Sequence, residues 1–428
     1  MLVWFLPLFL LFLLIGLPVF FGLLAAPGIL LWLNDQARDG AMLYRNIYNG
    51  IDSFPLMAIP FFMLAGELMN RGGITHRLVE FSQAMMGHLK GGLAHVNVLT
   101  SMLFAGLSGS AVADTSAIGS MLIPAMEKQG YTKKFAAAIT AATATIGPII
   151  PPSIPMVLYA LVSNASIGSL FLGGIVPGLF MGAVLMGMNT LISHRRGFGN
   201  EEPVPLRDLP AITVKATPAL LMPAILLFGI YSGVTTPTEA AAIAALYALL
   251  IAGGLYRALK LRSLYDVFVE SARSAASVGL VIGSSMILTY VVVQENIPQA
   301  ISGIFESSSI SPLAFLILVN VLVLLLGCVL DATVIILVIV PLFIPTCNAL
   351  GIDLVHFGVL IVVNSMIGLI TPPYGILLFV INAVTGIPLK DIIAEIWAFL
   401  AILIAALVCM IAFPKIILWL PKMFGYQG

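Results

Sequence analysis

Two short segments decide the fold: residues 146–152, Ile-Gly-Pro-Ile-Ile-Pro-Pro, and residues 367–373, Ile-Gly-Leu-Ile-Thr-Pro-Pro. In each, a glycine lies four residues before a Pro-Pro pair, in the middle of a long apolar run. A further glycine, Gly130 or Gly351, lies 21 residues before the first proline of each pair. Because Pro-Pro removes two backbone donors and bars the preceding residue from helical geometry, each run must break within its apolar stretch.

The composition around these segments is that of a membrane protein. The 428 residues are 60% hydrophobic and 9% charged, with a mean hydropathy of +1.11, which excludes a soluble globule. Residues 135–194 hold no charged side chain, which is enough for two spans of about 20 residues each. The formal net charge is zero, so we expect no nucleic-acid partner. The first 34 residues lack the basic start of a signal peptide and are expected to form an uncleaved span.

We therefore predict an all-α polytopic membrane protein. Full spans are expected near residues 2–33, 51–70, 135–165, 169–194, 216–234, 238–256, 274–294, 355–388 and 396–414. Residues 92–127 and 311–346 are split by small and polar residues, and arms of about 13 to 20 residues suit re-entrant hairpins better than full crossings. Each hairpin precedes one of the two broken helices. Irregular backbone at such depth is tolerated only where it lines an enclosed cavity, and paired broken helices are typical of a secondary transporter's binding site.

Basic residues give the orientation. With both hairpins re-entrant, fifteen of the 19 basic residues fall on one face, which the positive-inside rule makes cytoplasmic: Arg71, Arg77, Lys90, Lys128, Lys133, Lys134, Arg195, Arg196, Arg207, Lys215, Arg257, Lys260, Arg262, Arg273 and Lys390. Residues 274–389 contain no Lys or Arg, and the flanks of the second hairpin carry only Glu295, Glu306 and Asp353. The two hairpin units therefore enter from opposite sides, as an inverted-topology repeat. Residues 255–269 are expected to form an amphipathic cytoplasmic helix between the halves.

This organisation predicts five consecutive units. They are N-terminal scaffold helices (1–91), a first transport unit of hairpin and broken helix (92–165), scaffold helices with the connecting helix (166–310), a second transport unit (311–388) and a C-terminal helix (389–428).

The tip of the first hairpin, residues 106–116, combines glycines with hydroxyl side chains. Glycine permits a tight turn, and hydroxyl and carbonyl oxygens are hard ligands for a small cation. The helix that begins near Thr115 would present its N-terminal amides to an anion. The alternative is that the Ser and Gly residues only allow close helix packing.

Asp114 and Asp331 are the sharpest signal, because a carboxylate within a bilayer costs at least about 2.5–3.5 kcal/mol and so needs a partner or a role. Each can support a bound cation, or can cap the helix that follows it, and both readings stay open. Glu239 likewise caps a helix or lies near the transport path.

The helix breaks would supply the opposite wall of each site, with a simple proline kink as the alternative. We predict sodium ligands on both tips and both breaks: Ser108, Ser110, Thr143, Thr145, Gly147, Gly327, Cys328, Gly368 and Thr371. The substrate would lie between the two tips, with candidate ligands Ser108, Ser110, Asp114, Thr115, Pro152, Glu239, Asp331 and Thr333.

The chain resembles, nearly end to end, the large membrane (M) subunit of tripartite ATP-independent periplasmic transporters. The resemblance rests on the tip at residues 108–116, the breaks at 146–152 and 371–373, and the segment 233–240 with its Thr-Pro-Thr-Glu. It implies an elevator mechanism similar to that of the ion transporter superfamily, sodium coupling, a small four-helix membrane partner (the Q subunit) and a soluble periplasmic binding protein. Substrates of the family are organic acids, including C4-dicarboxylates and sialic acid.

The sequence thus predicts a multi-pass protein of the bacterial inner membrane that takes up a carboxylate with Na⁺, not an enzyme. We favour an acidic sugar such as sialic acid over a C4-dicarboxylate. The alternatives are a stand-alone sodium or proton symporter of dicarboxylates, or an anion channel. No phosphate-binding Gly-x-x-x-x-Gly-Lys-Ser/Thr motif is present, so ATP is not hydrolysed by that route.

Overall fold

The structure, a computed structural model, describes residues 2–33, 40–199, 204, 205, 207–294, 296, 299, 303 and 310–428. These residues form helices and no strand, which confirms the all-α prediction. Six helices are long and apolar enough to cross a membrane, or seven if one bent pair counts as a single span. The predicted hairpin flanks Glu295 and Glu306 lie outside the described residues.

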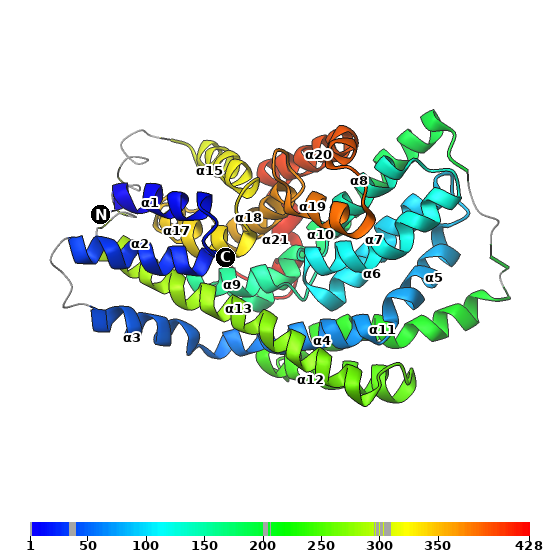
Figure 1. The fold of residues 1–428 in the computed structure, drawn as a ribbon, viewed down its shortest axis with the longest axis horizontal. Helices are drawn as coiled ribbons and strands as arrows, with labels where there is room; N and C mark the ends of the chain where they lie inside the picture. The colour runs from blue at the N-terminus through cyan, green and yellow to red at the C-terminus, as the bar shows by residue number, and fades with distance from the viewer. Residues whose placement is uncertain are drawn as a thin grey trace.

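The N-terminal region differs from the predicted single span over residues 2–33. Two helices, α1 (Leu2–Leu14) and α2 (Val19–Leu33), lie side by side instead (Figure 1). The break has two causes: Gly16 takes a left-handed conformation with φ of +84°, and Pro18 cannot continue the first helix. The chain continues through α3 (Gly40–Ile51), the short 3₁₀ turn η2 (Phe54–Met57), α4 (Ala58–Arg71) and α5 (Ile74–Met86).

The first predicted hairpin and broken helix are both present. The hairpin consists of α6 (Gly92–Ser108) and α7 (Ala111–Lys128), joined at Gly109, whose φ is +58°. The broken helix consists of α8 (Lys133–Ala144) and α9 (Ile154–Ser163), separated by a turn that holds the Pro151–Pro152 pair in a cis bond.

Between the two units lie α10 (Ile167–Arg196), α11 (Leu209–Tyr231), α12 (Pro237–Leu249), the π-helical turn η3 (Leu250–Leu255) and α13 (Leu261–Gln294). The amphipathic helix predicted over 255–269 is present only from Leu261 onward, where it forms the first part of the long helix α13. Nothing in the sequence between 262 and 278 breaks a helix, so the surface segment and the span are continuous.

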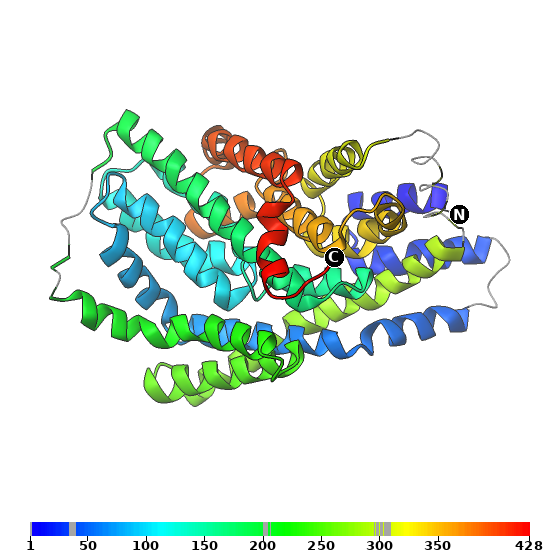
Figure 2. The same ribbon diagram turned by 180° about the vertical axis from the view of Figure 1, so that it is seen from behind.

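The second unit repeats the first. Its hairpin has α15 (Pro312–Gly327) as one arm, and α16 (Ala332–Val334), the π-helical turn η4 (Ile335–Ile339) and α17 (Val340–Ala349) as the other. The broken helix consists of α18 (Leu354–Gly368) and α19 (Ile376–Thr385), with Pro372–Pro373 also cis. The chain ends with α20 (Leu389–Ala412) and α21 (Lys415–Met423), the red helices of Figure 2, which pack against α10.

The packing separates two groups of helices. The hairpins and broken helices contact one another, α20 packs on α8, and α10 and α4 both pack on α6. In the second group, α4 packs against α12 and α13, and α13 also packs along α3 (Figure 1). The candidate site lies where the hairpin tips meet this second group.

Candidate functional site

The first hairpin tip is built by a helix end followed directly by a helix start. Gly109 supplies the left-handed residue that ends α6, and Ser110 is the N-cap of α7, its hydroxyl accepting from the Ala113 amide at 3.4 Å. The Ser108 hydroxyl in turn accepts from the Ser110 amide at 3.2 Å. Because Ser110 holds the cap, the alternative that Asp114 caps a helix is wrong; Asp114 lies one turn inside α7.

Asp114 is fully buried. Its Oδ1 accepts a hydrogen bond from the Ser108 hydroxyl. Within the described part of the chain, its Oδ2 has no hydrogen-bond donor. Gly147 packs directly against Oδ2, so that a Cβ at this position would overlap the carboxylate. A buried carboxylate oxygen without a donor is costly, and this one lies between the first tip and the first break.

The break itself closes around the tip. The Ser153 hydroxyl donates to the Pro148 carbonyl and accepts from the Met156 amide, which starts α9. The carbonyl oxygen of Pro152 faces Gly109, and a Cβ on Gly109 would lie 2.8 Å from it. The first tip and the first break are therefore in direct contact, as the sequence predicts.

The two threonines predicted near this break are engaged elsewhere. The Thr143 hydroxyl donates to Asn97 Oδ1 on α6 at 2.8 Å, and the Thr145 hydroxyl donates to the Ala142 carbonyl at 2.6 Å. Thr115 donates to the Ala111 carbonyl at 2.7 Å within its own helix. All three side chains are buried, and none lines the cavity between the tips.

The second tip is similar in path but different in chemistry. Asp331 is the N-cap of α16 and accepts from the Thr333 amide at 3.0 Å, so Asp331 corresponds to Ser110 rather than to Asp114. Gly327 packs on Gly368 backbone to backbone, and a Cβ on Gly327 would lie 3.2 Å from the Gly368 Cα. This close approach joins the second tip to the second break.

The remaining predicted residues of this half bond to their own helices. Cys328 Sγ donates to the Leu324 carbonyl at 3.3 Å, and the Thr371 hydroxyl donates to the Ile367 carbonyl at 2.8 Å. Asn364, four residues before Gly368, donates to Asn320 Oδ1 on α15 at 2.9 Å. Asn364 occupies the position relative to the break that Thr143 occupies in the first half, and each side chain ties its broken helix to its hairpin.

A cavity of about 280 Å³ lies between the two tips and the helices α4 and α13. Its polar lining comes from four elements: Glu67 and Asn70 of α4, Ser108 and Ser110 of the first tip, Glu270, Ser271 and Ser274 of α13, and Asp331 and Thr333 of the second tip. The described lining includes no Lys or Arg. Its hydroxyl, amide and carboxylate groups can bind a small polar molecule or a hard cation.

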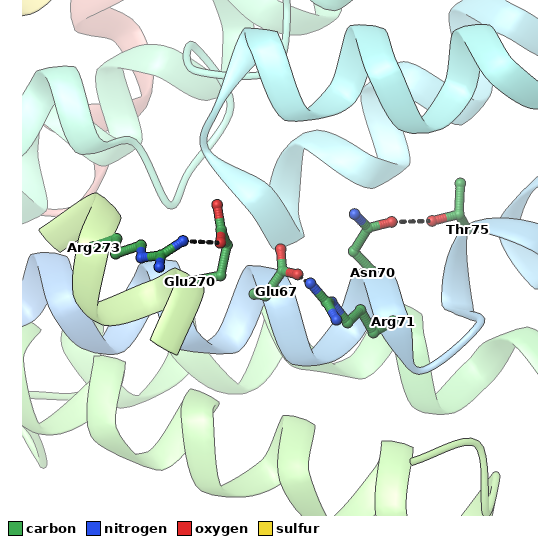
Figure 3. A network of polar contacts seen from close by, with 6 residues as sticks. All are labelled: Glu67, Asn70, Arg71, Thr75, Glu270 and Arg273. Carbon is green, nitrogen blue, oxygen red and sulfur yellow. Dashed lines mark hydrogen bonds and ion pairs between the residues drawn. The ribbon is translucent and has the colours of Figure 1, made fainter. Parts of the chain in front are cut away.

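The α4 and α13 side of this cavity was missed by the sequence analysis. Glu67 pairs with Arg71 at 2.6 Å, and Glu270 lies 3.9 Å from Arg273 (Figure 3). Asn70 accepts from the Thr75 hydroxyl at 3.3 Å (Figure 3). The available signal was Glu67, an ionisable residue within the apolar run 51–70, which is by default a candidate for function.

Glu239 is not part of the site. Its carboxylate accepts from the Thr236 amide at 2.8 Å and forms a capping box at the start of α12. It is exposed and absent from the cavity lining. Of the two roles predicted for Glu239, the structure shows the helix cap.

Comparisons with known proteins agree on one family. A profile described as "Tripartite ATP-independent periplasmic transporter, DctM component" matches residues 6–416. The chain is 39% identical over 413 residues to the sialic acid TRAP transporter large permease protein SiaM of Vibrio cholerae, covering 96% of both chains. It is 41% identical over 404 residues to the C4-dicarboxylate TRAP transporter large permease protein DctM of Pseudomonas aeruginosa, covering 94% of both. Among solved structures, the Alcanivorax borkumensis YdaH transporter matches with a TM-score of 0.65 at 16% identity over 88% of each chain, a likeness of fold.

Proposed function

Since this chain belongs to the DctM component family of tripartite ATP-independent periplasmic transporters, we propose that it couples sodium entry to the uptake of an organic acid across the bacterial inner membrane. The observation that carries the proposal is the buried Asp114 carboxylate between a hairpin tip and a helix break. Its Oδ2 has no donor among the described residues and lies against Gly147. The same tip opens onto a cavity shared with the second hairpin.

The residues around Asp114 fit a sodium ion. Ser108, Ser110, Asp114 and the backbone near Gly147 offer hydroxyl, carboxylate and carbonyl oxygens, the ligands of hard cations. The described residues contain no cluster of three or more His, Cys, Asp or Glu side chains, which a transition metal would favour. At the second tip, Gly327, Cys328, Gly368 and Thr371 would contribute mainly backbone oxygens. Bound sodium would supply the positive charge that these oxygens and a substrate carboxylate both need.

We propose that the substrate lies in the cavity between Ser110 and Asp331. The N-terminus of α7 and the Ser110 hydroxyl would bind its carboxylate. The lining holds three carboxylates, Glu67, Glu270 and Asp331, and many neutral hydrogen-bonding groups. Such a lining repels a second negative charge and favours hydroxyl groups, so an acidic sugar such as sialic acid fits better than a C4-dicarboxylate.

The substrate would cross by movement of the hairpin units against α4 and α11, as in an elevator. Two glycine contacts support this boundary. Gly66 of α4 packs on the backbone of Ser108, and a Cβ on Gly66 would lie 3.2 Å from the Ser108 Cα. Gly106 of the hairpin packs on the ring of Pro223 of α11, where a Cβ on Gly106 would lie 2.5 Å from the Pro223 Cγ. Smooth, small-residue surfaces let two rigid bodies slide past one another without interlocked side chains.

We further propose two partners, a small four-helix membrane subunit and a soluble periplasmic binding protein that delivers the substrate. The family description and the words "large permease" in the names of both relatives support this. Uptake by the purified chain alone, without either partner, would instead support the stand-alone symporter.

The decisive experiment is sodium-driven uptake in proteoliposomes that contain the chain and its partners. Asp114→Asn and Asp331→Asn should each reduce uptake. Asp114→Asn should also raise the sodium concentration for half-maximal uptake about 10- to 150-fold, because a lost charge-assisted contact costs about 1.5–3 kcal/mol of binding free energy. Asp353→Asn is the matched control, since Asp353 also caps a helix, α18, but lies outside the cavity. Intact sodium-driven uptake in the Ser110, Asp114 and Asp331 variants would show that the site is assigned wrongly.

A further inference from the structure

A second groove lies where α5, α11 and the turn after η3 meet, and it shares no lining residue with the cavity between the hairpin tips. Its volume is about 700 Å³. The groove is lined on one side by His76, Arg77 and Glu80 of α5, and on the other by Lys215 of α11 and Tyr256. Arg77 and Lys215 both belong to the basic face of the molecule that the charge distribution makes cytoplasmic.

Contacts of Arg77 and Tyr256 join the three elements that form this groove. The Arg77 guanidinium lies 3.6 Å above the centre of the Tyr256 ring, and its Nη1 donates to the Gly73 carbonyl at 2.9 Å. The Tyr256 hydroxyl donates to the Lys215 carbonyl at 2.9 Å. The stacking leaves other guanidinium N–H groups available to an anion, because Arg carries five donors. The Arg77 guanidinium is therefore held in place, and the backbone of Lys215 is fixed beside it.

The charge balance of the groove is positive. Within the described residues, no carboxylate lies within 4.0 Å of the charged nitrogens of Arg77 or Lys215. The one carboxylate in the lining, Glu80, pairs with His76 at 3.1 Å. Two unpaired cations therefore face the same space.

The groove also has an apolar border that points away from the protein. Val214 is 71% exposed and Leu255 is 59% exposed, and both line the groove. Lys215 lies six residues inside the membrane-spanning helix α11, about 9 Å from its start. A lysine one and a half turns inside such a span would extend its amine toward the headgroup level, which would place the cations near lipid phosphates and the apolar border near acyl chains.

We infer that this groove binds the headgroup of an anionic phospholipid of the cytoplasmic leaflet. Its phosphate would be bound by Arg77 and Lys215, with the acyl chains along Val214 and Leu255. Basic pockets between membrane helices on the cytoplasmic side are suited to such headgroups. Because α5 packs on both α6 of the first hairpin and α11, the lipid would brace the junction between the moving unit and its surroundings. The inference does not depend on the transported substrate.

The test is a lipid titration of the purified full-length chain, with its small subunit if the two copurify, in neutral detergent. Native mass spectrometry would compare phosphatidylglycerol with phosphatidylethanolamine. Phosphatidylglycerol should bind more tightly, and Lys215→Gln should weaken it about fivefold, which corresponds to about 1 kcal/mol per basic residue near the membrane surface. Glu80→Gln should strengthen it, because the variant removes the only carboxylate among the described lining residues. Lys128→Gln, on the same predicted face but outside the groove, should leave it unchanged.

Three outcomes would overturn the inference. Equal losses in Lys215→Gln and Lys128→Gln would mean non-specific attraction to the basic face. Full competition by inorganic phosphate at millimolar concentration would mean a site for the free anion rather than for a lipid. If the Lys215→Gln variant no longer copurified with the small subunit but bound lipid as before, the groove would be an interface with that subunit. Arg77→Gln gives an independent second measurement in case Lys215→Gln fails to fold.

Discussion

Gly147→Ala is the most direct perturbation of the proposed sodium site. The added Cβ would overlap Asp114 Oδ2, which is fully buried and fixed on its other side by the Ser108 hydroxyl. The carboxylate must therefore move, and overpacking of this kind costs about 1–3 kcal/mol. If that cost falls on the sodium-bound state, the sodium concentration for half-maximal uptake rises about 5- to 150-fold.

The assay is initial uptake of labelled substrate into proteoliposomes as a function of external sodium. Gly187→Ala is the control for the glycine-to-alanine change itself, because Gly187 lies within helix α10, where a Cβ would contact nothing within 4 Å. A thermal unfolding curve for both variants separates a damaged site from a damaged fold. The Gly147→Ala change is then repeated in an Asp114→Ala background, where the overlapping oxygen is gone.

Two results are expected if Gly147 acts through the Asp114 carboxylate. Gly147→Ala must shift the sodium dependence while Gly187→Ala does not, and its effect must largely disappear when Asp114 is already alanine. A Gly147→Ala protein whose half-maximal sodium concentration stays within about twofold of the parent would refute the site, since even 1 kcal/mol corresponds to about fivefold. An undiminished effect in the Asp114→Ala background would show that Gly147 acts on the break and not through the carboxylate.

Two further changes test the structural roles of polar residues outside the cavity. Glu239→Ala should lower the thermal midpoint by removing the capping box of α12, while the substrate and sodium concentrations for half-maximal uptake stay unchanged; altered substrate affinity would return Glu239 to the transport path. Asn364→Leu should destabilise the protein by about 1–3 kcal/mol in thermal unfolding, because it leaves the buried Asn320 Oδ1 without its donor. Adding Asn320→Leu should cost less than the sum of the two single changes, and strict additivity would contradict the link between the hairpin and the broken helix.

The sequence predicts the architecture well because the strongest local rules act at its key points. Pro-Pro pairs must break a helix, and both predicted breaks are present. Short apolar arms around small residues must return to the side from which they enter, and both hairpins form. The single N-terminal span over 2–33 was wrong because the long apolar run hides a local break, Gly-Leu-Pro at residues 16–18, which divides it into α1 and α2.

The site is less predictable because it depends on which helices meet. The breaks and tips were located by motif, but the wall formed by α4 and α13 comes from segments 200 residues apart that no local pattern connects. Asp114 and Asp331 are not equivalent in spacing, because Asp114 lies 33 residues before Gly147 whereas Asp331 lies 37 residues before Gly368. Both lie before a helix break in sequence, yet Asp331 caps a helix start while Asp114 lies one turn inside its helix and faces inward. Asp331 lies at the exposed start of its helix, whereas Asp114 lies one turn further inside its helix and is buried.

The way the halves pack suggests why the two sites would act together. Each hairpin packs against the first half of its own broken helix: α7 contacts α8, and α15 contacts α18. The second halves are exchanged, because α19 packs on α7 of the first hairpin and α9 packs on η4 of the second. A shift of either helix break must therefore move both hairpin arms. Ligand binding that orders one tip would therefore shift the conformational equilibrium of the other tip through α9 and α19. Coupling between two sites requires such a shared element with two arrangements. Two separate kinked helices would not provide this link.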